Sequence, residues 1–241
     1  MFYENGSIYD QSTILNADFS LNRTLLAEQG LPWYATTNAI YYLGQNMALG
    51  ATFTHCVLWY GRDVLEAFKG YRSRTLRDKH YQTILKNYKE VPMWVYGAIL
   101  VASFVMAIAT CYTGDSHLPW YGIIAAYAVA CAIFPFICIF PSITGWQVST
   151  DTLVLMLGSA VVPGNSQANM YFQLFGANAA TQGINLASDL KLAQYTKLPP
   201  RTTLWVQSLG TVIGGILQIV IAKQILATHR EILLDVAGNN M

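Results

Sequence analysis

The chain is poor in charged residues. Of its 241 residues only 11% are Asp, Glu, Lys or Arg, against roughly 25% in an ordinary soluble domain. Hydrophobic residues make up 54%, so lipid is the expected solvent for much of the chain. The formal net charge of +1 argues against the strongly cationic surface that nucleic-acid binding requires. We therefore expect a membrane protein whose partner is the lipid bilayer, and no nucleic-acid partner.

Motifs of enzymes and metal sites are also lacking. The four cysteines have no Cys-x-x-Cys spacing and no neighbouring histidine pair, which argues against metal ligation. Neither a phosphate loop nor a Ser-His-Asp grouping is found. An intramembrane enzyme would need a nucleophile beside a base, and the adjacent pair His55 and Cys56 would point about 100° apart on a helix. We expect no enzyme, no cofactor and no metal.

Three long apolar segments predict membrane-spanning helices. They are Trp94–Tyr112, Trp120–Phe140 and Leu204–Ala222, each close to the roughly 20 residues that a span needs. A fourth segment, Asn38–Tyr60, is long enough to span but carries polar side chains that are costly against lipid. We expect this helix to be packed inside a bundle. Its polar residues are Asn38, Gln45, Asn46 and His55.

The stretch from Thr152 to Ser188 is interrupted. A short apolar run ends at Pro163-Gly164, and an amide-rich run follows. This pattern predicts two short or broken helices that meet at the break. The fold class that we expect is all-α, a polytopic transmembrane helical bundle of about six hydrophobic segments, one or two of them short or broken.

The distribution of basic residues predicts the orientation. Residues 62–90 hold eight of the fourteen Lys and Arg residues, which favours a cytoplasmic location. We divide the chain into an external polar segment (1–37), a transmembrane region (38–222) with a cytoplasmic basic loop (62–93), and an external tail (223–241). Counting the spans then places the stretch 191–201 in the cytoplasm.

Side-chain amides are concentrated between Pro163 and Ser188. Amides donate and accept hydrogen bonds without carrying charge, so they can line a path for a polar solute. A helix break at membrane depth is tolerated where it is buried or lines a cavity. The alternative is a helix pair held together by amide hydrogen bonds. The candidates for the solute path are Asn169, Tyr171, Gln173, Asn178 and Gln182.

His55 is the one histidine inside a proposed span, which makes it a candidate proton relay. The alternative is a neutral ring that is hydrogen-bonded within the bundle. Near the other end of the chain, Pro199 and Pro200 are expected to end one helix before Thr202 or Thr203 caps the next. We also expect an ionic link between Asp189 and one of the nearby cations.

Several motifs extend along the chain: Pro163-Gly164, Ala168-Asn169-Met170, Ser188–Leu192, Lys197–Arg201, and the longer segments 27–63 and 88–100. Together they resemble the oligopeptide transporter family of fungi and plants. The resemblance implies proton-coupled transport of short peptides, or of related thiol peptides and metal chelates, by a multi-pass protein of the plasma membrane. It also implies a cytoplasmic signature, formed by Asp189, Lys191, Lys197, Pro199, Pro200 and Arg201.

The sequence departs from the family pattern in two places and in length. Gln173 stands where the family commonly has Lys, and Leu155 or its apolar neighbours stand where an acidic residue is common. The chain resembles the later half of a longer protein, so the missing half of a transporter is an expected partner. The alternative is a truncated membrane protein that does not transport and associates with a full-length transporter or, through its basic loop, with lipid.

Overall fold

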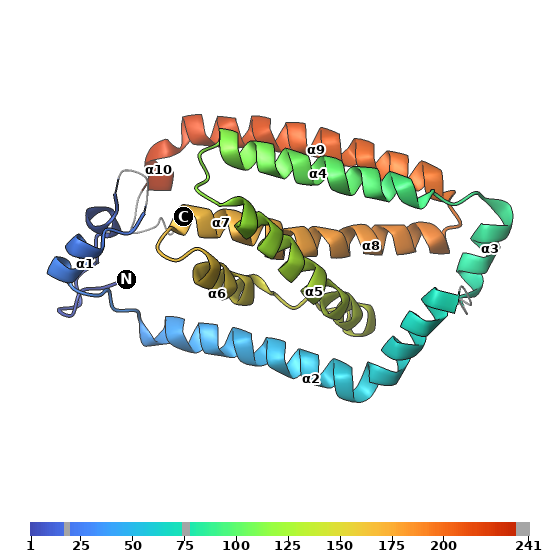
Figure 1. Ribbon diagram of the computed structural model, residues 1–241, viewed down its shortest axis with the longest axis horizontal. Helices are drawn as coiled ribbons and strands as arrows, with labels where there is room; N and C mark the ends of the chain where they lie inside the picture. Colours follow the sequence, from blue (N-terminus) through green and yellow to red (C-terminus); the bar gives the residue numbers. More distant parts are fainter. Residues whose placement is uncertain (17–19, 74–77, 235–241) are drawn as a thin grey trace. The chain divides into compact units, whose positions relative to one another are not determined.

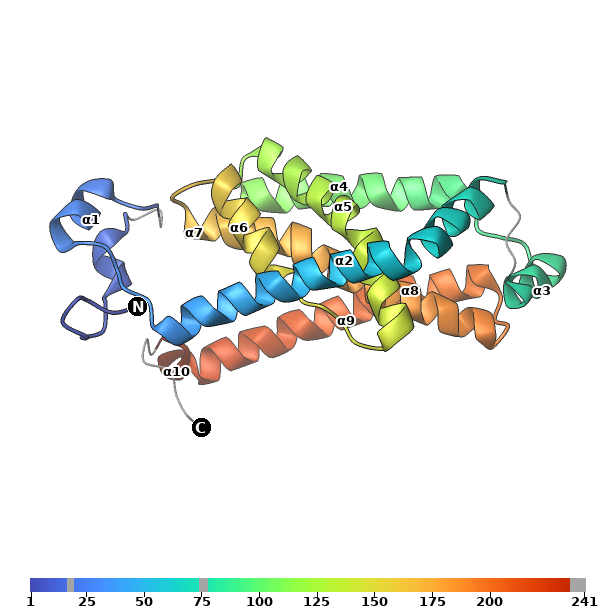
Figure 2. The same cartoon turned by 90° about the horizontal axis from the view of Figure 1, so that it is seen from below.

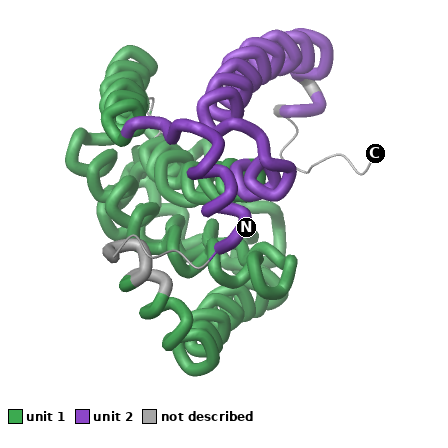
Figure 3. Tube along the Cα trace, turned by 90° about the vertical axis from the view of Figure 1, so that its right-hand side faces the viewer, with its two compact units in different colours: residues 1–76, 93–189 green, residues 77–92, 190–241 purple. Residues whose placement is uncertain are grey.

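The computed structural model describes residues 1–16, 20–73 and 78–234 (Figure 1). The described residues form helices joined by loops, with a few isolated β-bridges and no β-strand. The chain divides into two compact units, coloured green and purple in Figure 3. Unit 1 comprises Met1–Leu76 and Met93–Asp189, and unit 2 comprises Arg77–Pro92 and Leu190–Met241. The expected all-α membrane bundle is confirmed.

Three described helices are long and apolar enough to cross a membrane. They are α4 (Met93–Thr113) and α5 (Trp120–Thr144) in unit 1 and α9 (Pro200–Thr228) in unit 2. These helices contain the three spans predicted from the sequence. Helix α5 runs past its predicted end until Gly145 adopts a left-handed conformation, with φ +74°, and donates its N–H to the carbonyl of Pro141.

Helix α2 (Thr36–Ser73) differs from its prediction. It contacts α5 and α6 along one side (Figures 1 and 2), and most of its other described side chains are exposed. Packing inside a bundle was therefore the wrong expectation for the described chain. Asn46 shows how a polar group of this helix finds partners without being enclosed: its Nδ2 donates to the Tyr42 carbonyl, one turn earlier, at 2.9 Å and to Met156 Sδ of α6 at 3.5 Å.

The predicted break at Pro163-Gly164 is confirmed. Helix α6 (Asp151–Val161) ends before it, and α7 (Ser166–Gln173) begins after it. Gly164 takes a φ of +82°, which glycine adopts without steric cost, and the Asn165 side chain caps α7 by accepting the Ala168 N–H at 3.0 Å. The second helix is longer than expected, because a π-helical turn, η2 (Leu174–Asn178), connects α7 directly to α8 (Ala179–Tyr195).

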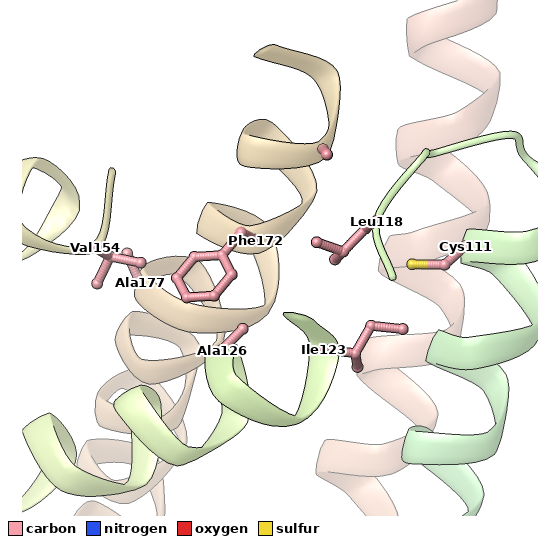
Figure 4. Packing of buried hydrophobic residues seen from close by; sticks show 8 residues of the cluster. Cys111, Leu118, Ile123, Ala126, Val154, Phe172 and Ala177 are labelled. Carbon is pink, nitrogen blue, oxygen red and sulfur yellow. The ribbon is translucent and has the colours of Figure 1, made fainter. Parts of the chain in front are cut away.

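The core of unit 1 lies between α5, α6 and α7. The Phe172 ring is fully buried and lies close to Ala126, Val154 and Ala177 (Figure 4). Small residues allow this approach, since a Cβ at Gly176 would lie 2.7 Å from Val154 Cγ1. The core therefore holds the start of the amide-rich helix firmly against α5 and α6.

The N-terminal part of unit 1 contains η1 (Gln11–Ile14) and α1 (Arg23–Gln29). It meets the helix break directly, because the Leu21 N–H donates to the Gly164 carbonyl at 2.8 Å. An isolated antiparallel bridge between Ser20 and Asn165 adjoins this bond. This segment therefore lies beside the break rather than apart from it.

Unit 2 contains α3 (Lys79–Asn87), the last turn of α8, α9 and α10 (Arg230–Leu234). After α8, Lys197 takes a φ of +60° and the chain turns. Helix α9 begins with Pro200 as its first residue and Pro199 as its N-cap, a position that suits proline because no N–H is needed there. The expectation that Thr202 or Thr203 caps this helix is wrong: the Thr203 hydroxyl donates to the Pro199 carbonyl at 3.1 Å instead.

Candidate functional site

A cavity of about 450 Å³ lies where α6, α7, η2 and α8 meet, and we name it the amide cavity. Its volume falls within the roughly 300–1,000 Å³ of small-molecule sites. Gln173 and Asn178, two of the five residues predicted for the solute path, line it. The full lining is Asp151, Met170, Gln173, Leu174, Asn178 and Thr181.

The π-helical turn supplies part of this lining. The Ala179 N–H donates to the carbonyl of Leu174, five residues earlier, which is the π-helical spacing. Such turns are rare and occur frequently at functional sites. Leu174 and Asn178, the first and last residues of the turn, both line the amide cavity. The irregularity in the helix therefore coincides with the cavity.

The amide cavity lies partway along a long helix. Segments α7, η2 and α8 have 8, 5 and 17 residues, 30 in all, and measure about 45 Å at 1.5 Å per residue. That exceeds the roughly 30 Å hydrocarbon core of a bilayer. The lining residues of this helix, 170 to 181, lie about 6 to 23 Å from its start. The cavity thus lies along the first half of the helix, roughly one third of the way from its start.

Asn169 lines a second cavity, of about 280 Å³, beside the helix break. Its Nδ2 donates to Ser159 Oγ at 2.7 Å and to the Leu155 carbonyl at 3.3 Å. Its Oδ1 is buried and has no hydrogen-bond partner among the described residues. An unsatisfied buried acceptor is costly and calls for an explanation. The other lining residues are Leu15, Leu21, Ser159, Val162, Gly164, Asn165 and Ser166.

The other predicted path residues lie elsewhere. Tyr171 packs against the core of unit 1, and Gln182 is exposed. His55, the candidate proton relay, is exposed as well and stacks on the Trp59 ring at a centroid distance of 5.1 Å. None of these three is among the residues that line the two cavities.

Asp151 is the residue of the amide cavity that the sequence analysis missed. It is the first residue of α6 and directly precedes Thr152, where the predicted interrupted stretch begins. The loop before α6 lies against the middle of α8, because Gln147 Nε2 donates to Asn185 Oδ1 at 3.3 Å. One signal was available in the sequence: Asp151 is the one acidic residue between Asp115 and Asp189.

A second cluster, within unit 2, joins the predicted cytoplasmic signature to α3. Lys191 Nζ lies 2.5 Å from Asp78 Oδ2 and 2.8 Å from Gln194 Oε1. The same ammonium group is 5.0 Å from the centre of the Tyr195 ring, which meets the His80 ring edge-on at 5.2 Å. The hydrogen bond from Lys191 lowers the pKa of the Asp78 carboxyl, with a smaller contribution from the His80 N–H.

Arg201 makes the second link of this cluster. Its Nε donates to the carbonyl of Glu90 at 3.3 Å, and the Glu90 carboxylate accepts the hydroxyl of Tyr81. Asp189, near the end of α8, and Lys197, just after that helix, are both exposed. The ionic link expected for Asp189 stays a prediction. The sequence analysis did not foresee α3 as the partner of this turn.

Comparison with known proteins gives relatives along the whole chain. It is 31% identical to glutathione transporter 1 of Schizosaccharomyces pombe over 223 residues, which cover 92% of this chain and 26% of that protein. It is 30% identical to oligopeptide transporter 6 of Arabidopsis thaliana, covering 89% of this chain and 30% of that protein. Oligopeptide transporter 1 of Saccharomyces cerevisiae is 28% identical, with 89% and 28% covered.

The chain therefore spans about a quarter to a third of the length of the curated relatives it matches. No solved structure matches it. The family model described as OPT oligopeptide transporter protein matches residues 1–241. This chain belongs to the OPT oligopeptide transporter family.

Proposed function

We propose that this chain forms part of the solute path of a multi-pass, proton-coupled transporter for short oligopeptides. The observation that carries the proposal is the amide cavity, where Gln173 and Asn178 lie together at a π-helical turn. A peptide backbone offers N–H donors and carbonyl acceptors, and a side-chain amide can bond both. The names of the relatives, which are glutathione and oligopeptide transporters, support the same class of solute.

The orientation predicted from the basic residues is part of this proposal. The contacts of Lys191 with Asp78 and of Arg201 with Glu90 join the turn after α8 to the basic loop. Lys191 lies near the end of α8 and Arg201 in the first turn of α9, and helix ends in direct contact with a loop lie on the same side of a membrane as that loop. The contacts therefore support a common, cytoplasmic location for both segments, and the plasma membrane is the membrane that we propose.

Proton coupling, with His55 as the candidate relay, is also proposed. Peptide binding should then change the number of bound protons, which a pH-sensitive dye in weakly buffered solution would report. Binding of peptide to the purified chain with no proton taken up or released, at several pH values, would contradict the coupling.

A second candidate is a membrane protein that does not transport and associates with a full-length transporter or with lipid. The observation that favours it is the exposure of apolar side chains along α9, of which none of the most apolar 18-residue stretch is buried. Binding and uptake of a radiolabelled alanine tetrapeptide separate the two candidates. The remaining part of a transporter is the partner that we propose, so the chain alone should bind the peptide in nanodiscs but not accumulate it in cells.

Each alternative outcome of this experiment is informative. Accumulation by cells that express the chain alone would contradict the need for a remaining part. Absence of binding to the purified chain would contradict the peptide path and favour the second candidate.

A further inference from the structure

Asp151 is the one charged residue among those that line the amide cavity. It is exposed, and its Oδ2 accepts a hydrogen bond from the Ser149 hydroxyl at 2.9 Å. Among the side chains that the structure describes, no Lys, Arg or His group lies within ion-pair distance of its carboxylate. The cavity therefore has a negative charge that no described side chain neutralises.

The surrounding sequence adds no basic residue. No Lys or Arg occurs from Met93 to Leu190, a stretch that contains α4 to α7, η2 and the first 12 of the 17 residues of α8. Its acidic residues are Asp115, Asp151 and Asp189. A cleft whose charged groups all have one sign attracts ligands of the opposite sign. The local charge thus favours a cationic ligand and disfavours an anionic one.

The position of Asp151 along the helices also supports a role in binding a ligand. Helix α6 has 11 residues, about 16 Å, and its far end lies at the break where the long α7–η2–α8 helix begins. Asp151 is therefore about one third of the way along that 45 Å helix, and the contact of Gln147 with Asn185 agrees with this depth. Ionisable residues at membrane depth are costly, and they mark paths for solutes or ions.

We propose that Asp151 binds a protonated primary amine of the solute, which in a short peptide is the N-terminal ammonium group. Gln173 and Asn178 then bond the peptide backbone that follows. This inference rests on the proposed function and specifies the polarity of its substrate. Hydrogen bonds between an ammonium group and a carboxylate are roughly twice as strong as neutral ones, so the amine should contribute strongly to binding. A lysine side chain offers the same chemistry at another point of a peptide.

A purely structural role of Asp151 would give a different result. A carboxylate in the first turn stabilises a helix through its dipole, and α6 would gain from Asp151 in that way. Such a role would not distinguish a peptide with a free amino terminus from one whose amino terminus is acetylated. Selectivity for the amine is therefore the decisive measurement.

The test compares three probes on the full 241-residue chain in lipid nanodiscs, by equilibrium binding. The probes are the alanine tetrapeptide, its N-acetylated form, and N-acetyl-Ala-Ala-Ala-Lys. We expect the free amine to bind about tenfold more tightly than the acetylated form. If N-acetyl-Ala-Ala-Ala-Lys binds as tightly as the free tetrapeptide, the site accepts any primary amine. If it binds as weakly as the acetylated tetrapeptide, the site accepts the N-terminal amine. Both outcomes support an ammonium site at Asp151.

Variants assign the selectivity to one carboxylate. Asp151→Asn keeps the size and the polarity of the side chain and should reduce the tenfold preference to about one. Asp151→Glu should retain most of it, because the charge remains. Asp115→Asn is the matched control, since Asp115 is acidic but lies outside the lining of the amide cavity, and it should retain the full preference.

The outcomes that would overturn the inference differ from those that would overturn the proposed function. Equal affinity for the free and acetylated tetrapeptides, or a preference that survives in Asp151→Asn, overturns the ammonium site and leaves the peptide path intact. Absence of binding for all three probes overturns the peptide path and the ammonium site together.

Discussion

The ammonium group of Lys191 lies 2.5 Å from the Asp78 carboxylate, although 113 residues separate them in the chain. Both side chains are partly exposed, at 45% for Lys191 and 31% for Asp78. Solvent-exposed ion pairs contribute about 0.2–1 kcal/mol, so this contact orients α3 more than it stabilises the protein. Its significance is that it attaches the basic loop to the turn between α8 and α9.

Removing the charge of Asp78 should loosen α3. Asp78 is also the N-cap of α3, since its side chain accepts the His80 N–H at 2.9 Å. Asn caps as well as Asp does, so Asp78→Asn removes the ion pair and keeps the cap. We expect hydrogen exchange of the amides in 79–87 to become about two to five times faster, which corresponds to about 0.4–1 kcal/mol.

The partner variant completes a double-mutant cycle. Lys191→Met should accelerate exchange in the same segment by a similar factor, and the double variant should add little to either single one. Fully additive effects would contradict a direct interaction between the two side chains. Asp78→Ala removes the cap and the charge together, so the amides in 79–87 should exchange fastest in this variant.

The same contact should depend on pH. The hydrogen bond from Lys191 lowers the pKa of Asp78 in the folded chain, whereas an unperturbed aspartate has a pKa of about 3.9. The stabilisation is therefore present above pH 4 and is lost as the pH falls through the folded value. Protection of 79–87, corrected for intrinsic exchange rates, should be constant above about pH 4 and should fall as the pH is lowered further. Asp78→Asn should show no such fall, and an identical fall in that variant would assign the effect to another group.

Gly158 allows α6 and α7 to approach closely. A methyl group on Gly158 would overlap Asn169 Oδ1 and lie 2.8 Å from Phe172 Cδ1. Overpacking of this kind costs about 1–3 kcal/mol, so Gly158→Ala should lower the thermal unfolding midpoint of the purified chain. Gly97→Ala in α4 is the control, because nothing lies within 4 Å of its added methyl group. Equal midpoints for the two variants would show that α7 can move away without cost.

The sequence predicted those elements that depend on the length of an apolar run or on the backbone preferences of proline and glycine. Long apolar runs predicted α4, α5 and α9, and Pro163-Gly164 predicted the break. Contacts between residues far apart in the chain could not be predicted from the sequence. The pairing of Lys191 with Asp78 depends on where the chain returns after 113 residues, and neither residue type nor spacing encodes that return.

The candidate site, too, was predicted only in part from the sequence. The density of amides indicated the helix that lines the amide cavity, and Gln173 and Asn178 are among its lining residues. Gln182 does not line it. Composition does not show which way each side chain of a helix points, and a π-helical turn shifts the register of the residues that follow it. Asp151 was missed because a charge beside an apolar run is normally a solvated helix end.

The two cavity amides give the final prediction. If Gln173 and Asn178 bond the peptide backbone, each change to Ala should remove about 0.5–1.5 kcal/mol of binding, and the double variant should bind the alanine tetrapeptide at least about fivefold more weakly. Equilibrium binding to the chain in nanodiscs measures this. Asn185→Ala is the matched control, an exposed amide on the same helix that does not line the cavity. A loss of affinity for Gln182→Ala as large as that for Gln173→Ala would instead favour the wider path predicted from the sequence, because Gln182 does not line the amide cavity.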